Sequence, residues 1–293
     1  MTTTGTRLPL PAKPHTHRRS ARRSIQGSLV RAVSLGLARG RLETLQFFRT
    51  REAVMFSLLF PAFMMIVLVT LFGSNISPDV EYSQYLVPGI IASGLITGGF
   101  QTLVIQIPIE RDRGGLKRLA ATPMPKSAYF IGKTIMVIVT SVIQLVILLV
   151  VSKLAFDVKL PATLGDWETF AWVYLLGITA CTLCGVAMSS IPRNGKTAPI
   201  VMAPISLILQ FISGVFTTQS HVPKWIQYVA DVFPLKWMCQ GMRSTFLPDS
   251  FAKAETGGGW QLGWVAAVTG AWVVLGLLLC LRSFRWTKSR DGG

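Results

Sequence analysis

The amino-acid sequence predicts an all-α membrane protein with six transmembrane helices, and two observations carry this prediction. Hydrophobic residues make up 51% of the 293 residues and charged residues only 14%, whereas soluble domains average about 25% charged residues. Six apolar runs alternate with polar connections, and each run is close to the roughly 20 residues that a helix needs to cross a bilayer. The chain is therefore expected to be an integral, multi-pass membrane protein.

Two segments precede the first apolar run. Residues 1–24 are rich in Thr, Pro, Arg and His and lack apolar periodicity, which predicts a disordered cytoplasmic tail. Residues 25–52 carry apolar side chains at mostly three- to five-residue steps between arginines. This pattern predicts an amphipathic helix in the membrane interface, with its basic face toward anionic lipid headgroups. A solvated helix beside the membrane is the alternative.

The membrane domain is predicted to cover residues 53–285, which leaves 286–293 as a short cytoplasmic tail. Pro61 is expected to kink the first transmembrane helix. Lys133 lies about one turn into the third helix and is expected to extend back to the membrane surface. The six predicted transmembrane helices are Ala53–Phe72, Tyr85–Pro108, Ala128–Val151, Phe170–Ile191, Ala198–Thr218 and Leu262–Leu281.

The net charge of +16 would suit a nucleic-acid-binding protein, but its distribution indicates a membrane orientation instead. Of the 29 Lys and Arg residues, 22 lie on the two terminal segments and on the connections 109–127 and 192–197, and six lie on the other three connections. Positively charged loops stay in the cytoplasm. Both termini are therefore predicted to be cytoplasmic, in a plasma (inner) membrane, and no nucleic-acid partner is expected.

Small and polar residues inside the predicted helices indicate either helix packing or a substrate path. Gly94 and Gly98 form a G-x-x-x-G pattern, which lets helix backbones approach closely. Unpaired amides are costly in lipid, so polar side chains in the spans should face the helix bundle or a hydrated cavity. Both roles stay open for Gln101, Gln106, Gln144, Gln210 and Ser213.

The stretch that begins at Gln219 is too polar to cross a membrane and predicts two short helices that dip into the outer leaflet. Pro223 can start the first of these helices, and Pro234 interrupts the apolar run that follows. Tryptophan is suited to the membrane interface. The residues that we single out in this outer segment are Pro223, Trp225, Pro234, Trp237 and Arg243.

The sequence shows no catalytic constellation. The three histidines are scattered, and no acidic residue lies inside a predicted span. Cys181 and Cys184 form a C-x-x-C pair within an apolar run without further metal ligands, so we interpret them as small core residues. Asn194–Thr197 ends like a phosphate-binding loop but lacks its first glycine and a preceding soluble strand. No catalytic, metal or cofactor site is therefore expected in this chain.

Two motifs resemble a known family. One is Glu110–Leu119 followed by Thr122-Pro123, and the other is Val222–Trp225 leading to Phe233–Leu235 and Arg243. They are similar to the E-R-E-x-G-T-L-x-x-L…T-P loop and the P-x-W…N-P-L…R segment of type-2 ABC transporter permeases. That family includes daunorubicin-type drug exporters and cell-envelope polysaccharide exporters. Gly115 replaces the usual Thr and Phe233 the usual Asn.

The resemblance implies six transmembrane helices, an N-terminal interfacial helix, a cytoplasmic coupling helix and re-entrant outer helices that act as a gate. It also implies that two subunits pair, by default as a homodimer, on two copies of a separate ABC ATPase that binds ATP and magnesium. Leu116 and Leu119 would supply the buried contact with this ATPase. The implicated coupling residues are Glu110, Arg111, Arg113, Gly114, Leu116, Lys117, Arg118, Leu119 and Pro123.

The predicted function is that of a transport subunit, not an enzyme, which exports a hydrophobic drug or lipid-like substrate along a path between the second and fifth spans. Three alternatives stay open. One is export of a cell-envelope polysaccharide or glycolipid, and another is an ATP-independent channel or scaffold. The third, a membrane-embedded enzyme, would require paired acids, histidines or a metal set at the ends of the spans.

Overall fold

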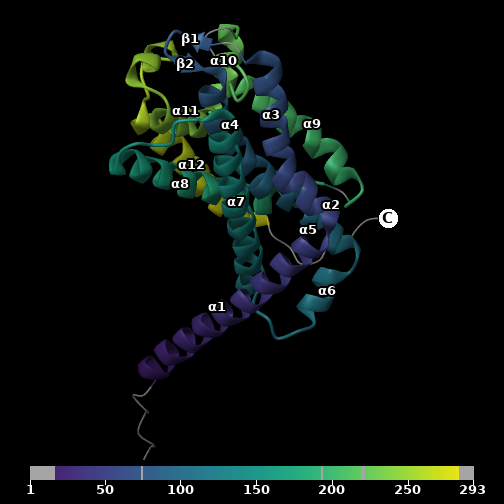
Figure 1. Cartoon of the computed structure of the whole chain (residues 1–293). Helices are drawn as coiled ribbons and strands as arrows, with labels where there is room; N and C mark the ends of the chain where they lie inside the picture. The colour runs from purple at the N-terminus through teal and green to yellow at the C-terminus, as the bar shows by residue number, and fades with distance from the viewer. Residues whose placement is uncertain (1–16, 74, 193, 219–221, 284–293) are drawn as a thin grey trace, which may run out of the picture.

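The computed structural model describes residues 17–73, 75–192, 194–218 and 222–283, which form a helical bundle with one small hairpin. The rest of the predicted N-terminal tail and the C-terminal tail lie outside the described residues. Figure 1 shows the hairpin and helix α10 (Lys224–Val232) at one end of the bundle and helix α6 (Gly115–Ala120) toward the other. We call these the α10 end and the α6 end.

Among the described residues, five helices are long and apolar enough to cross a membrane, and each overlaps a predicted span. The fifth of the six predicted spans, Ala198–Thr218, does not correspond to any of these long helices. It coincides with helix α9 (Thr197–Ile212), which has only 16 residues. At 1.5 Å per residue it is about 24 Å long, short of the roughly 30 Å hydrocarbon core. Gly214, with φ of +73°, lies in the turn that ends it. The five long helices are Arg51–Phe72, Tyr82–Asp112, Ser127–Phe156, Leu164–Met188 and Leu262–Arg282.

The first two long helices each contain a π-helical turn. The first consists of α2 (Arg51–Val54), η1 (Met55–Leu59) and α3 (Phe60–Phe72). Pro61 cannot donate a backbone hydrogen bond, and the π turn directly before it is where the helix accommodates the loss. The second consists of α4 (Tyr82–Leu95), η2 (Ile96–Gln101) and α5 (Thr102–Asp112), so its π turn lies in the middle of the span.

Helix α4 is the centre of the bundle. All but one of its 14 residues are buried. It contacts α3, α7 (Lys126–Phe156), α8 (Leu164–Met188) and α11 (Pro234–Phe246), while α12 (Leu262–Ser283) packs on α8 and α11. The main apolar core therefore surrounds α4, which connects α3, α7, α8 and α11.

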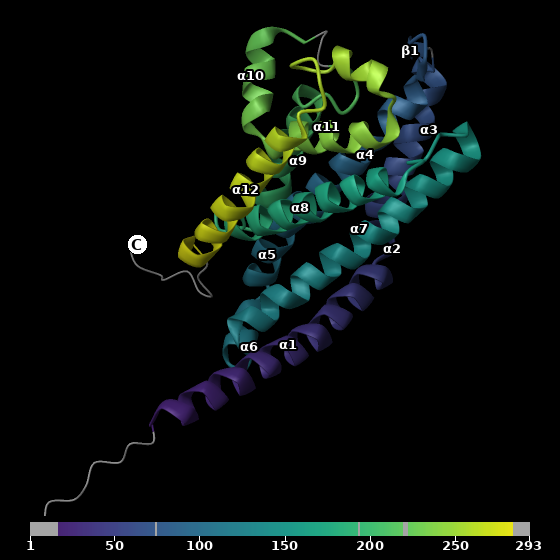
Figure 2. The same ribbon diagram turned by 90° about the vertical axis from the view of Figure 1, so that its left-hand side faces the viewer.

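Helix α1 (His17–Arg49) lies alongside α7, as Figures 1 and 2 both show. It begins at His17 and not at the predicted residue 25. Small residues make up part of its buried face, and Cβ atoms on Gly36 and Gly40 would come within 2.6 and 2.8 Å of Ile131 and Ile135 on α7. Small residues permit this close packing.

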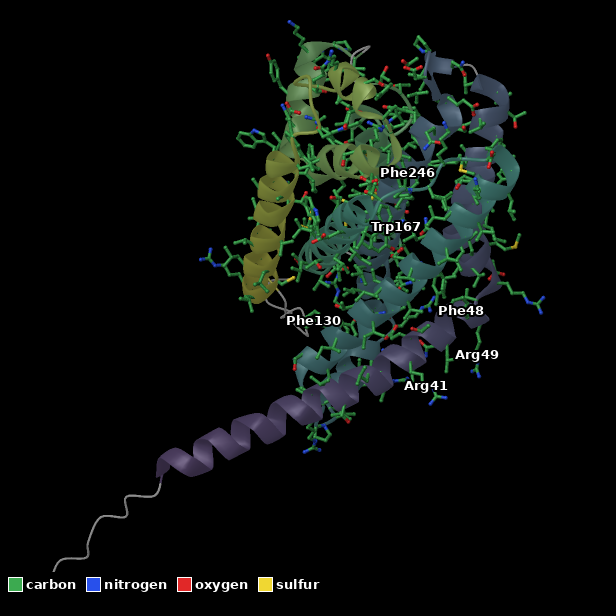
Figure 3. All side chains as sticks on the ribbon, turned by 60° about the vertical axis from the view of Figure 1, so that its left-hand side comes forward. Arg41, Phe48, Arg49, Phe130, Trp167 and Phe246 are labelled. Carbon is green, nitrogen blue, oxygen red and sulfur yellow. The ribbon has the colours of Figure 1, made fainter. Side chains whose placement is uncertain are left out.

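The opposite face of α1 carries apolar and basic residues that are interleaved, so the exposed surface of this helix is not divided into an apolar and a basic face. Figure 3 shows Arg41, Phe48 and Arg49 on this outward face. The exposed apolar residues include Val33, Leu37, Leu42, Leu45 and Phe48.

The α10 end consists of short elements. Strand β1 (Asn75–Ser77) pairs antiparallel with β2 (Val80–Glu81) directly before α4. Helices α10 and α11 fall in the stretch where two short helices were predicted, and their 9 and 13 residues are too few to cross a bilayer. The 3₁₀ helix η4 (Asp249–Ala254) follows α11. At the α6 end, α6 alone connects α5 to α7.

Candidate functional site

A buried ion-pair network joins three helices at the α6 end. Lys133 of α7 is fully buried and donates to Glu43 of α1 at 2.8 Å and to Glu110 of α5. Glu43 also pairs with Arg39 at 2.5 Å, and the Tyr129 hydroxyl donates to Glu110 at 2.9 Å. Charges can be buried when they compensate one another with hydrogen bonds. The predicted extension of Lys133 to the membrane surface is therefore wrong.

Beside this network, the end of α5 is fastened to the turn between α8 and α9. Arg111 donates to the carbonyl oxygen of Pro192 at 2.9 Å, and the backbone N–H of Gly195 donates to the Asp112 carboxylate at 2.6 Å. A Cβ atom on Gly195 would lie 2.7 Å from Cα of Ile109, so only glycine permits this approach. The end of α5 therefore lies directly against the turn that precedes α9.

Helix α6 presents basic residues outward and apolar residues inward. It follows Gly114, whose φ of +75° is a conformation that glycine adopts without strain. Leu116 is 1% exposed and belongs to the main core, and Leu119 is half-buried against it. Because this chain already covers Leu116, that residue cannot supply the predicted docking contact. The exposed predicted residues are Arg113, Lys117, Arg118 and Pro123.

A second candidate site is a groove of about 530 Å³ bordered by the first long helix, η2, α5 and α9. It brings together three of the predicted polar residues, Gln101, Gln106 and Gln210. The Ser93 hydroxyl donates to the Gln210 side-chain oxygen at 2.5 Å, which fixes that amide at the groove wall. The aromatic part of the lining consists of Phe47, Phe56, Phe60 and Phe216. None of the described lining residues is ionisable.

The other two predicted polar residues lie elsewhere. Gln144 is 6% exposed and packs against the G-x-x-x-G motif, where a Cβ atom on Gly94 would meet its side-chain nitrogen at 2.5 Å. Ser213 is 1% exposed, in the turn after α9. The structure therefore favours the packing role for Gln144, and the groove joins Gln101, Gln106 and Gln210 without it.

At the α10 end, Arg243 of α11 holds the turn that ends α9. Its guanidinium group is fully buried, donates to the carbonyl oxygen of Gly214 and pairs with Glu255 at 3.1 Å. It lies 3.9 Å from the centre of the Tyr85 ring, and the Tyr85 hydroxyl donates to the carbonyl oxygens of Gly214 and Thr217. A buried cation on an aromatic face stabilises this junction of α4, α9 and α11.

The other predicted residues of the outer segment separate into buried and exposed ones. Pro234 is the first residue of α11 and is buried, and Trp237 donates its indole N–H to the carbonyl oxygen of Asp231 at 2.7 Å. Pro223 caps α10, and Trp225 is 68% exposed on it. The predicted gate residues therefore do not form one cluster: Arg243, Pro234 and Trp237 hold the outer helices together, whereas Trp225 faces outward.

The sequence that resembled a phosphate-binding loop is a helix start. The side-chain oxygen of Asn194 accepts from the backbone N–H of Thr197, the first residue of α9. Cys181 and Cys184 are buried free thiols, as interpreted from the sequence. Within the described part of the chain, no group of three or more His, Cys, Asp and Glu side chains comes together as a metal site.

Sequence reasoning missed Glu43, Arg39 and Tyr129 as parts of the α6-end network. Glu43 is the lone acidic residue between many arginines in residues 25–51, and Lys133 is the lone charge inside its span. An isolated charge in a membrane helix predicts a partner. These two isolated charges, which are 90 residues apart in the sequence, could therefore have been predicted to pair.

The chain is also similar to known proteins. The family described as "ABC-2 type transporter" matches residues 38–247. A protein of Escherichia coli K12 described as "Probable multidrug ABC transporter permease YbhR" is 22% identical over 195 residues, covering 67% of this chain and 52% of the relative. The transport permease ycf38 of Porphyra purpurea is 26% identical over 178 residues, covering 60% of this chain and 58% of the relative. The chain thus spans somewhat more than half the length of these relatives.

Proposed function

This chain belongs to the ABC-2 type transporter family, and we propose that it is the membrane subunit of an exporter driven by a separate ATPase. The partner ATPase would bind ATP and magnesium. The observation that carries this proposal is the α6 surface. Its cations Arg113, Lys117 and Arg118 are exposed, whereas the neighbouring Glu110 and Arg111 are engaged within the chain.

The contacts at the α6 end are suited to transmit a displacement of α6 to other helices. Helix α6 is anchored through Leu116 in the core. The adjacent end of α5 is joined to α7 and α1 through Lys133 and to the turn before α9 through Asp112. A displacement of α6 would therefore reach the helices that border the groove. Coupling between packed elements with two arrangements travels through contacts of this kind.

The groove supports a substrate that is uncharged and amphiphilic. Aromatic side chains offer flat apolar contact, and the amides of Gln101, Gln106 and Gln210 offer hydrogen bonds. A phosphorylated lipid carrier of a polysaccharide would need cations in the site, and the described lining has none. Export of a hydrophobic drug or lipid-like molecule is therefore favoured over polysaccharide export.

A second copy of the chain would complete the path. Helix α9 borders the groove and exposes a run of large apolar side chains, including Ile200, Ile205, Ile208 and Phe211. A twofold partner that covers this face would convert two open grooves into one enclosed path. Intermolecular cross-linking through a cysteine placed at Ile208 would test this pairing. If no cross-linked dimer forms, the pairing is contradicted.

The docking surface can be tested by reversing two charges. We expect Lys117→Glu combined with Arg118→Glu to weaken association with the co-purifying ATPase at least tenfold, because both residues are exposed on α6. Binding is measured on the purified chain in detergent, after mass spectrometry has identified the co-purified partner by its phosphate-binding loop.

The matched control reverses two exposed charges at the α10 end, Lys153→Glu with Lys159→Glu. This variant should bind the ATPase like the unmodified chain. Unchanged ATPase affinity in the α6 variant, with its melting temperature preserved, would contradict docking at α6. A chain that transports without any ATPase would favour the channel alternative.

A further inference from the structure

Helices α4, α7 and α8 meet around a small cavity in the interior of the bundle. Its polar lining consists of Ser141 and Gln144 on α7 and Tyr174 on α8, and Gly94 on α4 forms the wall opposite Gln144. The remaining lining is apolar: Ile91, Leu95, Leu145 and Leu148. The cavity is separate from the larger groove, because the two share none of their described lining residues.

Two hydroxyl groups at this cavity have no hydrogen-bond partner among the described residues. Ser141 is 4% and Tyr174 is 6% exposed, and both side-chain oxygens are buried. Other hydroxyls in the same helices are satisfied locally, since Thr140 donates to the carbonyl oxygen of Met136 at 2.8 Å and Thr182 to that of Ile178 at 2.7 Å. A buried hydroxyl without a partner destabilises the fold. Two of them at one cavity therefore require a common explanation.

We infer that this cavity binds one ordered water molecule, shared by Ser141 and Tyr174. The space open to the centre of a water-sized sphere is about 10 Å³, which is enough for one water. The Tyr174 hydroxyl donates to the water, and the water donates to the Ser141 oxygen. The Gln144 amide lines the same cavity and supplies a third polar group, within the usual two to four partners of a buried water.

The water gives the three helices an adaptable contact. Gly94 provides the room, because a side chain there would meet Gln144. The π turn η2 begins two residues after Gly94, at Ile96. A water-mediated bond can re-form in a different geometry when helices shift, whereas a direct side-chain bond is lost. The bound water thus joins α7 to α8 beside the irregular part of the central helix.

A double-mutant cycle tests the inference on the full purified chain. Tyr174→Phe and Ser141→Ala each remove one of the three polar partners of the water and so weaken its hydrogen bond to the other hydroxyl. We expect each variant to lower the melting temperature by about 2–4 °C. The double variant should melt above the value expected from adding the two losses, because no unpaired hydroxyl remains.

Thr140→Val is the matched control, since Thr140 is satisfied by its own helix. Its effect should add to that of Tyr174→Phe. Single variants that leave the melting temperature unchanged or raise it would overturn the inference, because removing an unsatisfied hydroxyl relieves a cost. Additive effects of Tyr174→Phe and Ser141→Ala would overturn it as well. An electron-microscopy map that resolves waters should show density within hydrogen-bond distance of both oxygens, and its absence there would count against the site.

Discussion

Several charged side chains at the α6 end are paired within the chain and stabilise the fold. Glu110 and Arg111 looked from the sequence like members of a docking loop, yet Glu110 accepts from Lys133 and Tyr129, and Arg111 donates to Pro192. What remains exposed is Arg113, Lys117 and Arg118. One motif therefore contains two kinds of charge: half-buried charges that are paired within the chain beside α6, and exposed charges that a partner can recognise.

Lys133→Met should destabilise the chain strongly. The substitution leaves Glu43, which is 5% exposed in its side chain, and Glu110 without the cation that joins them. Removing one partner of a buried charge network costs about 3 kcal/mol or more. The free energy of unfolding by denaturant in detergent measures the loss.

Lys153→Met is the matched control for this prediction. Lys153 lies on the same helix and pairs with Asp157 at 2.5 Å, but the two side chains are 50% and 89% exposed. An ion pair in water contributes little, so this variant should keep the stability of the unmodified chain. If the two variants lose the same free energy of unfolding, burial does not increase the contribution of the network to stability.

At the scale of elements, irregular helices create the groove. The π turns η1 and η2 interrupt the first two long helices, and residues of both turns, including Phe56 and Gln101, line the groove. Helix α9 closes one side, and its early end at Gly214 is held by Arg243 and Tyr85. Regular helices of full length would pack without this space. Interrupted helices are where membrane bundles build polar sites.

Gln106→Leu should weaken recognition of an uncharged substrate. The substitution keeps the groove apolar and removes one of its three amides. One lost hydrogen bond is worth about 0.5–1.5 kcal/mol, so the half-stimulating concentration should rise about two- to thirteenfold. The measurement is ATP hydrolysis by the reconstituted complex against a panel of uncharged aromatic amphiphiles.

Gln46→Leu provides the control, because Gln46 is exposed on α1 and does not line the groove. It should respond to the panel like the unmodified complex. If Gln106→Leu also leaves every half-stimulating concentration unchanged, the groove is not the site of substrate recognition.

The whole molecule is electrically asymmetric between its two ends. At the α10 end, a cavity of about 1020 Å³ is lined by Asp79, Glu81, Asp157, Asp166 and Asp249, with Lys159 as its cation. At the α6 end, exposed arginines and lysines dominate. We propose that the α6 end faces the cytoplasm, since basic connections are retained on that side. An ATPase could then reach α6.

Labelling of one introduced cysteine at a time measures this orientation. An exposed cysteine placed at Asp79 should react with a membrane-impermeant maleimide on intact cells, whereas one placed at Arg118 should react only after the cells are permeabilised. The unmodified chain is the control, because its four cysteines are buried or half-buried. The opposite labelling pattern would invert the proposed topology.

The sequence by itself determined the fold class, the approximate position of the long helices and the family. Transmembrane helices follow from apolar length alone, and the charged motif at residues 110–119 is local. The short outer stretch was also visible, because prolines and polar residues interrupt its apolar runs. These features depend on neighbours along the chain.

Only the tertiary structure decided which residues meet. It placed Lys133 against Glu43, 90 residues away, and put Leu116 in the core. It separated Gln144 from Gln101, Gln106 and Gln210. It also ended α9 at 16 residues, through contacts from Arg243 and Tyr85. In an apolar bundle every helix face satisfies the same hydropathy pattern, so the pairing of faces depends on shape and on rare polar contacts, which a linear sequence does not specify.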